Sequence, residues 1–442
     1  MNWLDYNTRV VLAGTVLLGV SSGVVGTYML LRKRALVGDV ASHAALPGIG
    51  LAYLIMEQSH PGTGKWLPGL LLGAALSASA GLLVSHGLRQ IRRIKEDAAL
   101  GITLSLFFGV GVALLTLIQA LPTGQSAGLN DFIFGKAASM VASDVVGLAI
   151  TACVVIVVCA VVHKELALIC FDAEYAAAGG WSVGGVDLLL TALVIVVTVL
   201  GMQSVGLLLV VALLVLPPTS ARFWTDRLGT MVWTSALLGG VASAAGVLLS
   251  AGVPKLAAGA TIVLMGTAGF AVSVLFGRRR GLYWHWRAES ETRQRVGLDD
   301  LLRAVYEVIE PKLSSAAADL TAGSVSLPEL VSSRRWSTFR VRGLLQLAQS
   351  RGLMRRDAQD RFHLTATGRR EAQRAVRNHR LWELYLIHYA AVAPTHVDRS
   401  ADAIEHVLQP EIVDELEELL RDSSRTPAMP QSPHSAREAG GM

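Results

Sequence analysis

Residues 38–48 read Gly38-Asp39-Val40-Ala41-Ser42-His43-Ala44-Ala45-Leu46-Pro47-Gly48, and the chain remains largely apolar as far as residue 56. An apolar stretch of about 20 residues can cross a lipid bilayer as a helix. Asp39 and His43 interrupt this stretch, and ionisable side chains inside a membrane segment are costly and usually functional. The stretch therefore predicts a membrane-spanning helix that carries a functional charged pair.

Asp39 and His43 are four residues apart, so a helix places both side chains on one face. A carboxylate oxygen and an imidazole nitrogen can together bind a divalent transition metal. Pro47 and Gly48 follow one turn later, and we expect them to break or kink the helix, as in helices that line cavities at membrane depth. The residues alone leave a second interpretation open, in which Asp39 caps the helix at the cytoplasmic surface and His43 bonds a backbone carbonyl.

Similar apolar segments fill the first 280 residues. Hydrophobic residues make up 52% of the chain and charged residues 17%, whereas soluble proteins have about 25% charged residues. This composition excludes a disordered chain, a collagen-like fibre and a small disulfide scaffold. We expect nine membrane spans, at residues 10–31, 38–56, 66–87, 98–120, 143–162, 187–201, 203–221, 229–250 and 256–277.

Basic residues are unevenly distributed between the connections of these spans. Alternate connections, beginning with the one after residue 31, carry 13 Lys and Arg residues, while the N-terminus and the opposite connections carry 4. Cytoplasmic connections of membrane proteins are enriched in Lys and Arg. We therefore expect a multi-pass protein of the plasma membrane (the inner membrane of a bacterium), with the N-terminus outside and residues 278–442 in the cytoplasm.

Two further stretches support an interpretation by family. Residues 171–180 read FDAEYAAAGG, and residues 205–222 contain VGLLLV followed by LPPTSAR. Together with residues 38–48, they resemble the ABC-3 family of metal-importer permeases, which carry manganese, zinc or iron. The order, spacing and pattern of spans agree with that family over residues 10–277.

The resemblance implies roles for individual residues. Asp39 and His43 would line the permeation path and bind the transported metal, which is the substrate and not a catalytic cofactor. Five residues of the 171–180 stretch would contact a separate ATPase subunit, namely Phe171, Asp172, Glu174, Gly179 and Gly180. The family also implies a second permease subunit, identical or paralogous, and an extracytoplasmic metal-binding protein.

The chain itself has no nucleotide-hydrolysing motif. A GxxxxGK[ST] phosphate loop does not occur anywhere in the 442 residues. We therefore expect ATP hydrolysis on the partner subunit, and we expect this chain to be a transporter subunit and not an enzyme.

Residues 281–442 have a different composition, with 44 charged residues against 29 in residues 1–280. Helical patterns over 299–313, 327–333 and 338–351 precede two short strands near 353–356 and 361–364, which predicts a winged helix-turn-helix. Basic residues dominate the first part of this tail, which fits contact with nucleic-acid phosphates. Acidic residues dominate the last part, which fits dimerisation or metal binding.

The tail resembles iron- and manganese-dependent repressors of the diphtheria-toxin-repressor type over residues 297–425. Residues 364–370, 377–383 and 404–407 carry the resemblance. It implies a regulatory metal site at His379, Glu383, Asp402, Glu405 and His406.

Two positions depart from the repressor pattern. A ligand expected in the first helix falls at Arg303, a cation that would repel a metal, and a later histidine position falls near Asp398. A dimerisation scaffold, a cytoplasmic metal sensor and a membrane-tethered DNA-binding domain therefore all remain open for the tail.

The predicted fold is an all-α polytopic membrane bundle of about nine transmembrane helices, followed by a cytoplasmic winged helix-turn-helix and a helical dimerisation-like domain. The expected divisions are a transmembrane permease domain (1–280), a juxtamembrane linker (281–296), a winged-helix domain (297–366), a helical metal-binding or dimerisation-like domain (367–425) and a disordered tail (426–442).

The leading functional hypothesis is the permease subunit of an ATP-driven importer of manganese, zinc or iron, with a tail that senses metal. The alternative is a membrane-tethered, metal-responsive transcription regulator, although nine spans exceed what an anchor needs. A proton-driven secondary transporter is a third hypothesis, against which the 171–180 stretch argues.

Overall fold

The computed structural model describes residues 5–60, 63–91, 93–120, 135, 139–254, 256–310, 323–334 and 336–388. The chain divides into two compact units, Met1–His285 and Trp286–Met442. Each unit has its own cluster of buried apolar side chains. The two units are therefore described separately.

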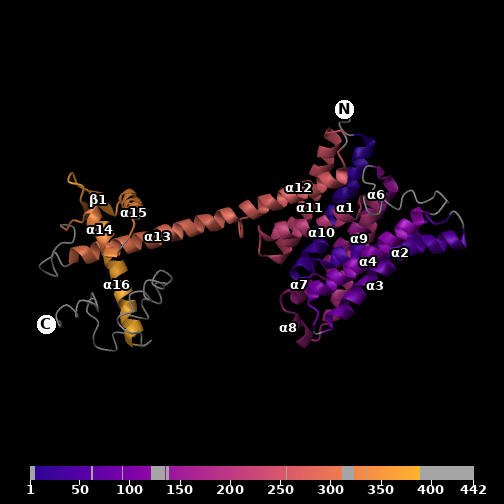
Figure 1. Cartoon of the computed structure of the whole chain (residues 1–442), viewed down its shortest axis with the longest axis horizontal. Coiled ribbons are helices and arrows are strands. Elements are labelled where there is room, and N and C mark those ends of the chain that lie inside the picture. Colours follow the sequence, from indigo (N-terminus) through magenta and orange to yellow (C-terminus); the bar gives the residue numbers. More distant parts are fainter. Residues whose placement is uncertain are drawn as a thin grey trace. The chain divides into compact units, whose positions relative to one another are not determined.

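The first unit is a bundle of apolar helices (Figure 1). Among the described residues, eight helices are long and apolar enough to cross a membrane: α1 (Tyr6–Leu31), α2 (Val37–Ser59), α3 (Leu67–Arg89), α4 (Glu96–Gln119), α6 (Ala142–Val161), α9 (Val183–Val205), α11 (Leu228–Gly252) and α12 (Ala258–Phe276). Eight of the nine expected spans thus form such helices. The predicted helical membrane bundle is confirmed.

The span expected at residues 203–221 takes a different form. It is α10 (Leu207–Arg222), an apolar helix of only 16 residues, because α9 continues to Val205. A Cβ built at Gly201 would lie 2.7 Å from the side chain of Val210, whereas nine residues of continuous helix would separate them by about 13 Å. The chain therefore folds back between the two helices, at Gly206, whose φ of +89° suits glycine because it has no Cβ.

α1 lies at the centre of the bundle. In the apolar 18-residue stretch of α1, 67% of the residues are buried, which is the highest share among the eight long helices. Close approach to α11 depends on small residues, since a Cβ at Gly19 would lie 2.4 Å from the carbonyl oxygen of Gly239. At the same contact the Ser235 hydroxyl donates a hydrogen bond of 2.8 Å to the Gly23 carbonyl.

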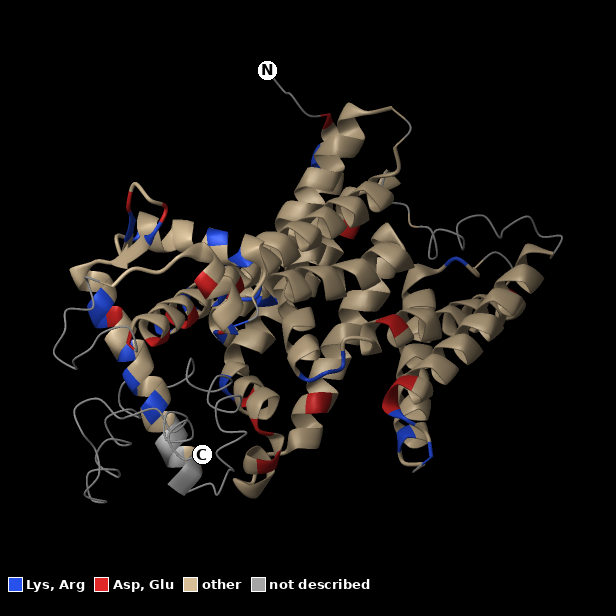
Figure 2. Ribbon diagram, turned by 60° about the vertical axis from the view of Figure 1, so that its left-hand side comes forward, with Lys and Arg blue, Asp and Glu red and all other residues tan. Residues whose placement is uncertain are grey.

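Charged side chains are sparse along the membrane helices and gather in the connections (Figure 2). Polar contacts join connections that the sequence assigns to one side of the membrane. Arg32, at the end of α1, pairs with Asp187 near the start of α9. The backbone N–H of Arg279, after α12, donates to the carbonyl of Phe223, after α10. One end of the bundle thus collects connections that are rich in Lys and Arg.

The second unit is built from α13 (Leu282–Ile309), α14 (Leu327–Arg334), α15 (Thr338–Ser350), β1 (Met354–Arg356), β2 (Phe362–Leu364) and α16 (Ala366–His388). β1 and β2 pair in antiparallel fashion with Met354 opposite Leu364. Helices and hairpin occur in the predicted order, so the helix-turn-helix and wing are confirmed. The first helix begins at Leu282, earlier than expected, and it continues through residues that we expected to form a linker.

Local signals set the boundaries of α15. The Ser337 side chain accepts a hydrogen bond from the backbone N–H of Arg340, which caps the N-terminus. Gly352, with a φ of +68°, follows the C-terminus in the left-handed conformation that glycine favours. The last turn therefore leads directly into β1.

Candidate functional site

Asp39 and His43 face each other on one side of α2. Nε2 of His43 lies 3.3 Å from Oδ1 of Asp39, and their side chains are 17% and 28% exposed. Two ligands that are each about 2.1 Å from one ion lie about 3.0 Å apart in octahedral and about 3.4 Å apart in tetrahedral coordination. The observed separation is therefore compatible with both atoms binding the same metal ion.

The pair opens into a cavity between α2 and α10. The cavity has a volume of about 380 Å³. It is lined by Leu36, Asp39, His43, Leu207, Leu208, Val211, Ala212, Val215 and Leu216. Because every α10 residue in this lining is apolar, Asp39 and His43 supply its metal-binding groups.

The imidazole of His43 is held by packing. Its ring meets the ring of Phe108 edge-on, with centroids 4.9 Å apart. Its Nδ1 atom is buried and has no hydrogen-bond partner in the part of the chain that the structure describes. A buried polar atom without a partner is unusual and calls for an explanation.

Asp39 lies in the first turn of α2, but its side chain makes no capping hydrogen bond. α2 has Leu36 at its N-cap, without a side-chain capping bond. The contacts of the His43 ring are with Asp39 and Phe108. The two side chains therefore contact each other and line the cavity.

Of the break or kink that we expected at Pro47, the break does not occur. It remains helical from Val37 to Ser59 with Pro47 inside, although Pro47 has no N–H to donate to the carbonyl of His43. Neighbouring helices hold this region: a Cβ at Gly111 of α4 would lie 3.1 Å from Pro47, and a Cβ at Gly48 would lie 2.0 Å from the Gly73 carbonyl of α3. Close packing of this kind allows proline inside membrane helices.

The described part of the chain contains no complete set of metal ligands around this pair. Within the described ranges, there is no group of three or more His, Cys, Asp or Glu side chains that could hold an ion. Metal sites in proteins have four or more ligands. A metal ion held by Asp39 and His43 would therefore need further ligands beyond these two side chains.

The 171–180 stretch forms a short helical corner between α6 and α9. α7 (His163–Phe171) leads into α8 (Ala173–Ala178). Asp172 caps α8 by accepting a 2.8 Å hydrogen bond from the N–H of Tyr175. Gly179 follows the helix and Gly180 has a φ of +84°, so three of the five residues singled out here also shape the corner.

This corner exposes apolar surface. Phe171 is 70% exposed, Tyr175 68% and Trp181 48%. Glu174 is also exposed, whereas Ala176 is the buried residue of α8. Exposed aromatic rings next to a carboxylate are typical of a surface that another protein covers.

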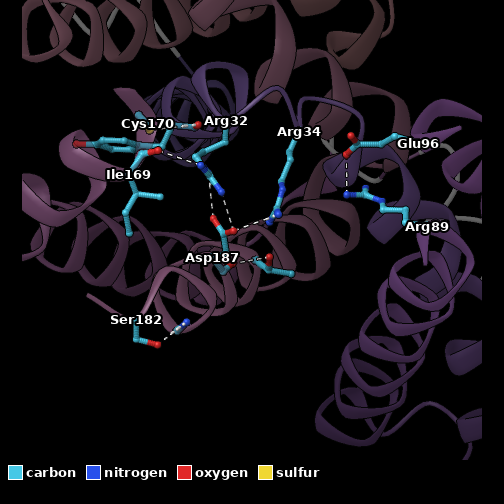
Figure 3. Close-up of polar contacts among 11 residues, drawn as sticks. Arg32, Arg34, Arg89, Glu96, Ile169, Cys170, Ser182 and Asp187 are labelled. Carbon is cyan, nitrogen blue, oxygen red and sulfur yellow. Dashed lines mark hydrogen bonds and ion pairs between the residues drawn. The ribbon is translucent and has the colours of Figure 1, made fainter. Parts of the chain in front are cut away.

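Asp187 ties this corner to the helices beside it (Figure 3). Arg32 donates from Nε and Nη2 to the two oxygens of Asp187, at 3.0 and 2.8 Å, and from Nη1 to the carbonyl of Ile169 in α7 at 2.9 Å. Arg34 adds a contact of 3.1 Å to Asp187. Two-point contacts between guanidinium and carboxylate are strong and directional. We call Arg32, Arg34, Asp187 and the Ile169 carbonyl the Arg32–Asp187 latch.

The predicted regulatory ligands are only partly described. His379 is buried on α16, where its Nδ1 atom contacts the guanidinium of Arg303 on α13. Glu383 lies in α16, but the structure does not describe its side chain. Asp402, Glu405 and His406 lie outside the described residues.

Comparison with known proteins places the first unit in a family. Residues 5–277 match the family described as ABC 3 transport family. The chain belongs to the ABC 3 transport family. This membership confirms the resemblance seen in the sequence motifs.

Relatives of this ABC 3 chain fall into two lengths. It is 35% identical to the manganese transport system membrane protein MntC of Bacillus subtilis, covering 99% of this chain and 97% of that protein. It is 41% identical to the zinc transport system membrane protein TroC of Treponema pallidum, covering 66% of this chain and 95% of that protein. The second alignment shows that some relatives correspond to little more than the first unit.

A solved structure agrees with the fold of this ABC 3 chain. PsaBC from Streptococcus pneumoniae in complex with Fab has a TM-score of 0.55 and 27% identity, covering 62% of this chain and 94% of that one. In addition, residues 365–434 match the metal binding and dimerisation domain of iron dependent repressors. The chain therefore combines an ABC 3 membrane unit with a C-terminal repressor domain.

Sequence reasoning missed the Arg32–Asp187 latch. Arg32 and Arg34 were counted only as basic residues of a connection, and Asp187 only as the start of a span. The available sequence signal for this cluster was Asp187, an acidic residue at the start of an apolar helix. Its arginine partners are 155 and 153 positions away in the sequence, so only the folded structure identifies them.

Proposed function

We propose that this chain is the permease subunit of an ATP-driven importer of a divalent transition metal, with manganese or zinc as the favoured cargo. The observation that carries the proposal is the Asp39–His43 pair, whose oxygen and nitrogen atoms lie 3.3 Å apart at the wall of a cavity. The names of MntC and TroC support the same class of cargo. An oxygen and nitrogen pair also admits iron.

The permeation site is completed by a second permease subunit. Two such chains about a two-fold axis would contribute two carboxylates and two imidazoles, which is enough for a transition metal. The ion binds ionised Asp39 and neutral His43, so protons compete with it.

The exposed corner around α8 binds the ATPase subunit. Phe171, Tyr175 and Trp181 offer aromatic surface to this partner, and Glu174 offers a charge that a basic residue can meet. Phe171, Asp172, Glu174, Gly179 and Gly180 are the residues of this coupling segment. The Arg32–Asp187 latch then connects movement of α7 to the link that precedes α2.

The end of the bundle that carries the latch faces the cytoplasm. Lys and Arg are enriched in its connections, as in cytoplasmic connections generally. The N-terminus then lies outside the plasma membrane, where an extracytoplasmic binding protein delivers the metal. The second unit lies in the cytoplasm on the same side as the ATPase.

The test is metal uptake by cells that express this chain with its partner subunits. Asp39→Asn keeps the shape of the side chain and removes its charge, and we expect it to lower manganese or zinc accumulation at least tenfold, because it removes an ionic ligand. Ser42→Ala is the matched control, since Ser42 is buried on the same helix and bonds only the Gly38 carbonyl of its own helix.

Elemental analysis of washed cells at matched membrane levels gives the result. Accumulation of one metal by the native chain names the cargo. Undiminished accumulation by Asp39→Asn would contradict the site. Absence of accumulation by the native chain with its ATPase would favour the membrane-tethered regulator.

A further inference from the structure

Arg303 is a buried cation in the second unit. It lies on α13 and is 1% exposed, which makes it the largest fully buried side chain in the described part of the chain. Burying a charge is costly unless other groups compensate it. Its contacts therefore indicate what this position does.

The guanidinium of Arg303 reaches across to α16. Its Nη1 contacts Nδ1 of His379, and its Nε lies 3.6 Å from Oε1 of Glu307. A guanidinium has donors only, so Nδ1 must accept the hydrogen bond. The imidazole is then the neutral form that carries its proton on Nε2.

The adjacent residue makes a parallel contact between the same helices. Arg380 is 5% exposed and donates from Nη2 to Oε2 of Glu310 at 2.6 Å. Its guanidinium also lies 5.9 Å from the ring centroid of Tyr306 on α13. Side-chain contacts of two arginines thus link α13, and Glu310 directly after it, to α16 at the successive positions 379 and 380.

These contacts do not fit a metal ion at His379. A histidine ligand needs a free lone pair on one ring nitrogen, but Nδ1 uses its lone pair toward Arg303 and Nε2 carries the proton. A dication would also lie next to the fixed positive charge of Arg303. The region that contains His379 matches a repressor domain that is described as metal binding.

We propose that Arg303 takes the place of the metal ion at His379. The guanidinium is a permanent cation that connects α13 with α16, so this junction forms without metal and His379 binds none. The repressor domain of this chain then holds its fold at all concentrations of cytoplasmic manganese, and it does not sense the cargo through His379.

The test counts manganese bound to the full chain in lipid nanodiscs. Asp39→Ala is present in every sample and removes the pathway ligand, so the outcome is independent of the proposed transport site. Equilibrium dialysis against Mn²⁺ alone, followed by elemental analysis, compares this parent with His379→Ala, Arg303→Glu and the combination of both substitutions.

We expect His379→Ala to leave the bound manganese of the parent unchanged. We expect Arg303→Glu to add about one ion per chain, because it replaces the cation with a carboxylate ligand, and His379→Ala to remove that ion again. Arg340→Glu is the control for added negative charge, since Arg340 is 55% exposed on α15, and it should add none. Loss of about one ion from the parent on His379→Ala would overturn the proposal.

A second measurement does not depend on the folding of Arg303→Glu. Hydrogen exchange of the α16 amides in the parent should be the same with and without Mn²⁺, and Arg303→Gln should accelerate it, because it removes the charge that joins the helices. Slower exchange of the parent in the presence of Mn²⁺ would show that a metal occupies this junction, contrary to the proposal.

Discussion

At the tip of the β1–β2 hairpin, Asp357 accepts hydrogen bonds from the imidazole of His363 at 3.0 Å and from the backbone N–H groups of Arg361 and Gln359 at 2.8 and 2.9 Å. These bonds, with the one from His363 foremost, hold the pKa of this carboxyl below its ordinary value of 3.8. Because the pKa of Asp357 is lower in the folded state than in the unfolded state, the ionised carboxylate stabilises the hairpin above about pH 4. This stabilisation is lost as the pH falls through the folded-state pKa.

We therefore predict that Asp357→Asn accelerates amide exchange of residues 354–364 several-fold at neutral pH, because an amide accepts these bonds more weakly. It should also remove the acid dependence of that exchange after correction for intrinsic rates. Asp360→Asn is the matched control, since Asp360 is 65% exposed and asparagine tolerates its φ of +62°. Equal effects of the two substitutions would contradict the assignment.

At the scale of elements, the Arg32–Asp187 latch joins the end of α1, α7 and the start of α9. Arg32 and Asp187 are 15% and 14% exposed, so their pair is shielded from solvent far better than an exposed pair, which contributes about 0–1 kcal/mol. If the proposed coupling is correct, Asp187→Asn should reduce metal transport about tenfold, which corresponds to ~1.4 kcal/mol of lost coupling. ATP hydrolysis by the complex should continue.

Transport and ATP hydrolysis measured together in proteoliposomes separate uncoupling from misfolding. Glu96→Gln is the control. Arg89 and Glu96 form an ion pair across another connection (Figure 3), with a nitrogen–oxygen distance of 2.6 Å. The Glu96 side chain is 51% exposed, so this pair is open to solvent. Parallel loss of both activities in Asp187→Asn would indicate a structural role alone.

At the scale of the whole molecule, the two units have separate hydrophobic cores. The alignment with TroC covers 95% of that protein with 66% of this chain. We therefore predict that a chain ending at Gly281 inserts into the membrane at normal levels and imports metal within about twofold of the full chain, because the buried contacts of the first unit remain. Fluorescence-detected size exclusion and uptake assays check this, and degradation of the shortened chain would contradict it.

Several features of this protein follow from local sequence and could be predicted. Apolar runs of membrane length determine the helices, since a backbone in lipid must satisfy its hydrogen bonds within the helix. Ser337 and Gly352 determine where α15 begins and ends through capping and a positive φ. The spacing of Asp39 and His43 determines that they share a face of α2.

Other features were decided by tertiary structure, because they depend on residues distant in sequence. Packing of α4 against Pro47 and of α3 against Gly48 accompanies a continuous α2, where proline alone predicted a break or a kink. The chain reverses direction at Gly206, so the seventh span is shorter than expected. Hydropathy shows where apolar residues lie along the sequence but not where the chain turns back. Arg303 and His379 are 76 positions apart in the sequence and are in contact in the fold. The sequence shows Arg303 only as a departure from the repressor pattern, whereas the structure shows that it is a partner of the histidine. Charge and periodicity are local properties, whereas the partner of a buried charge is determined by the fold.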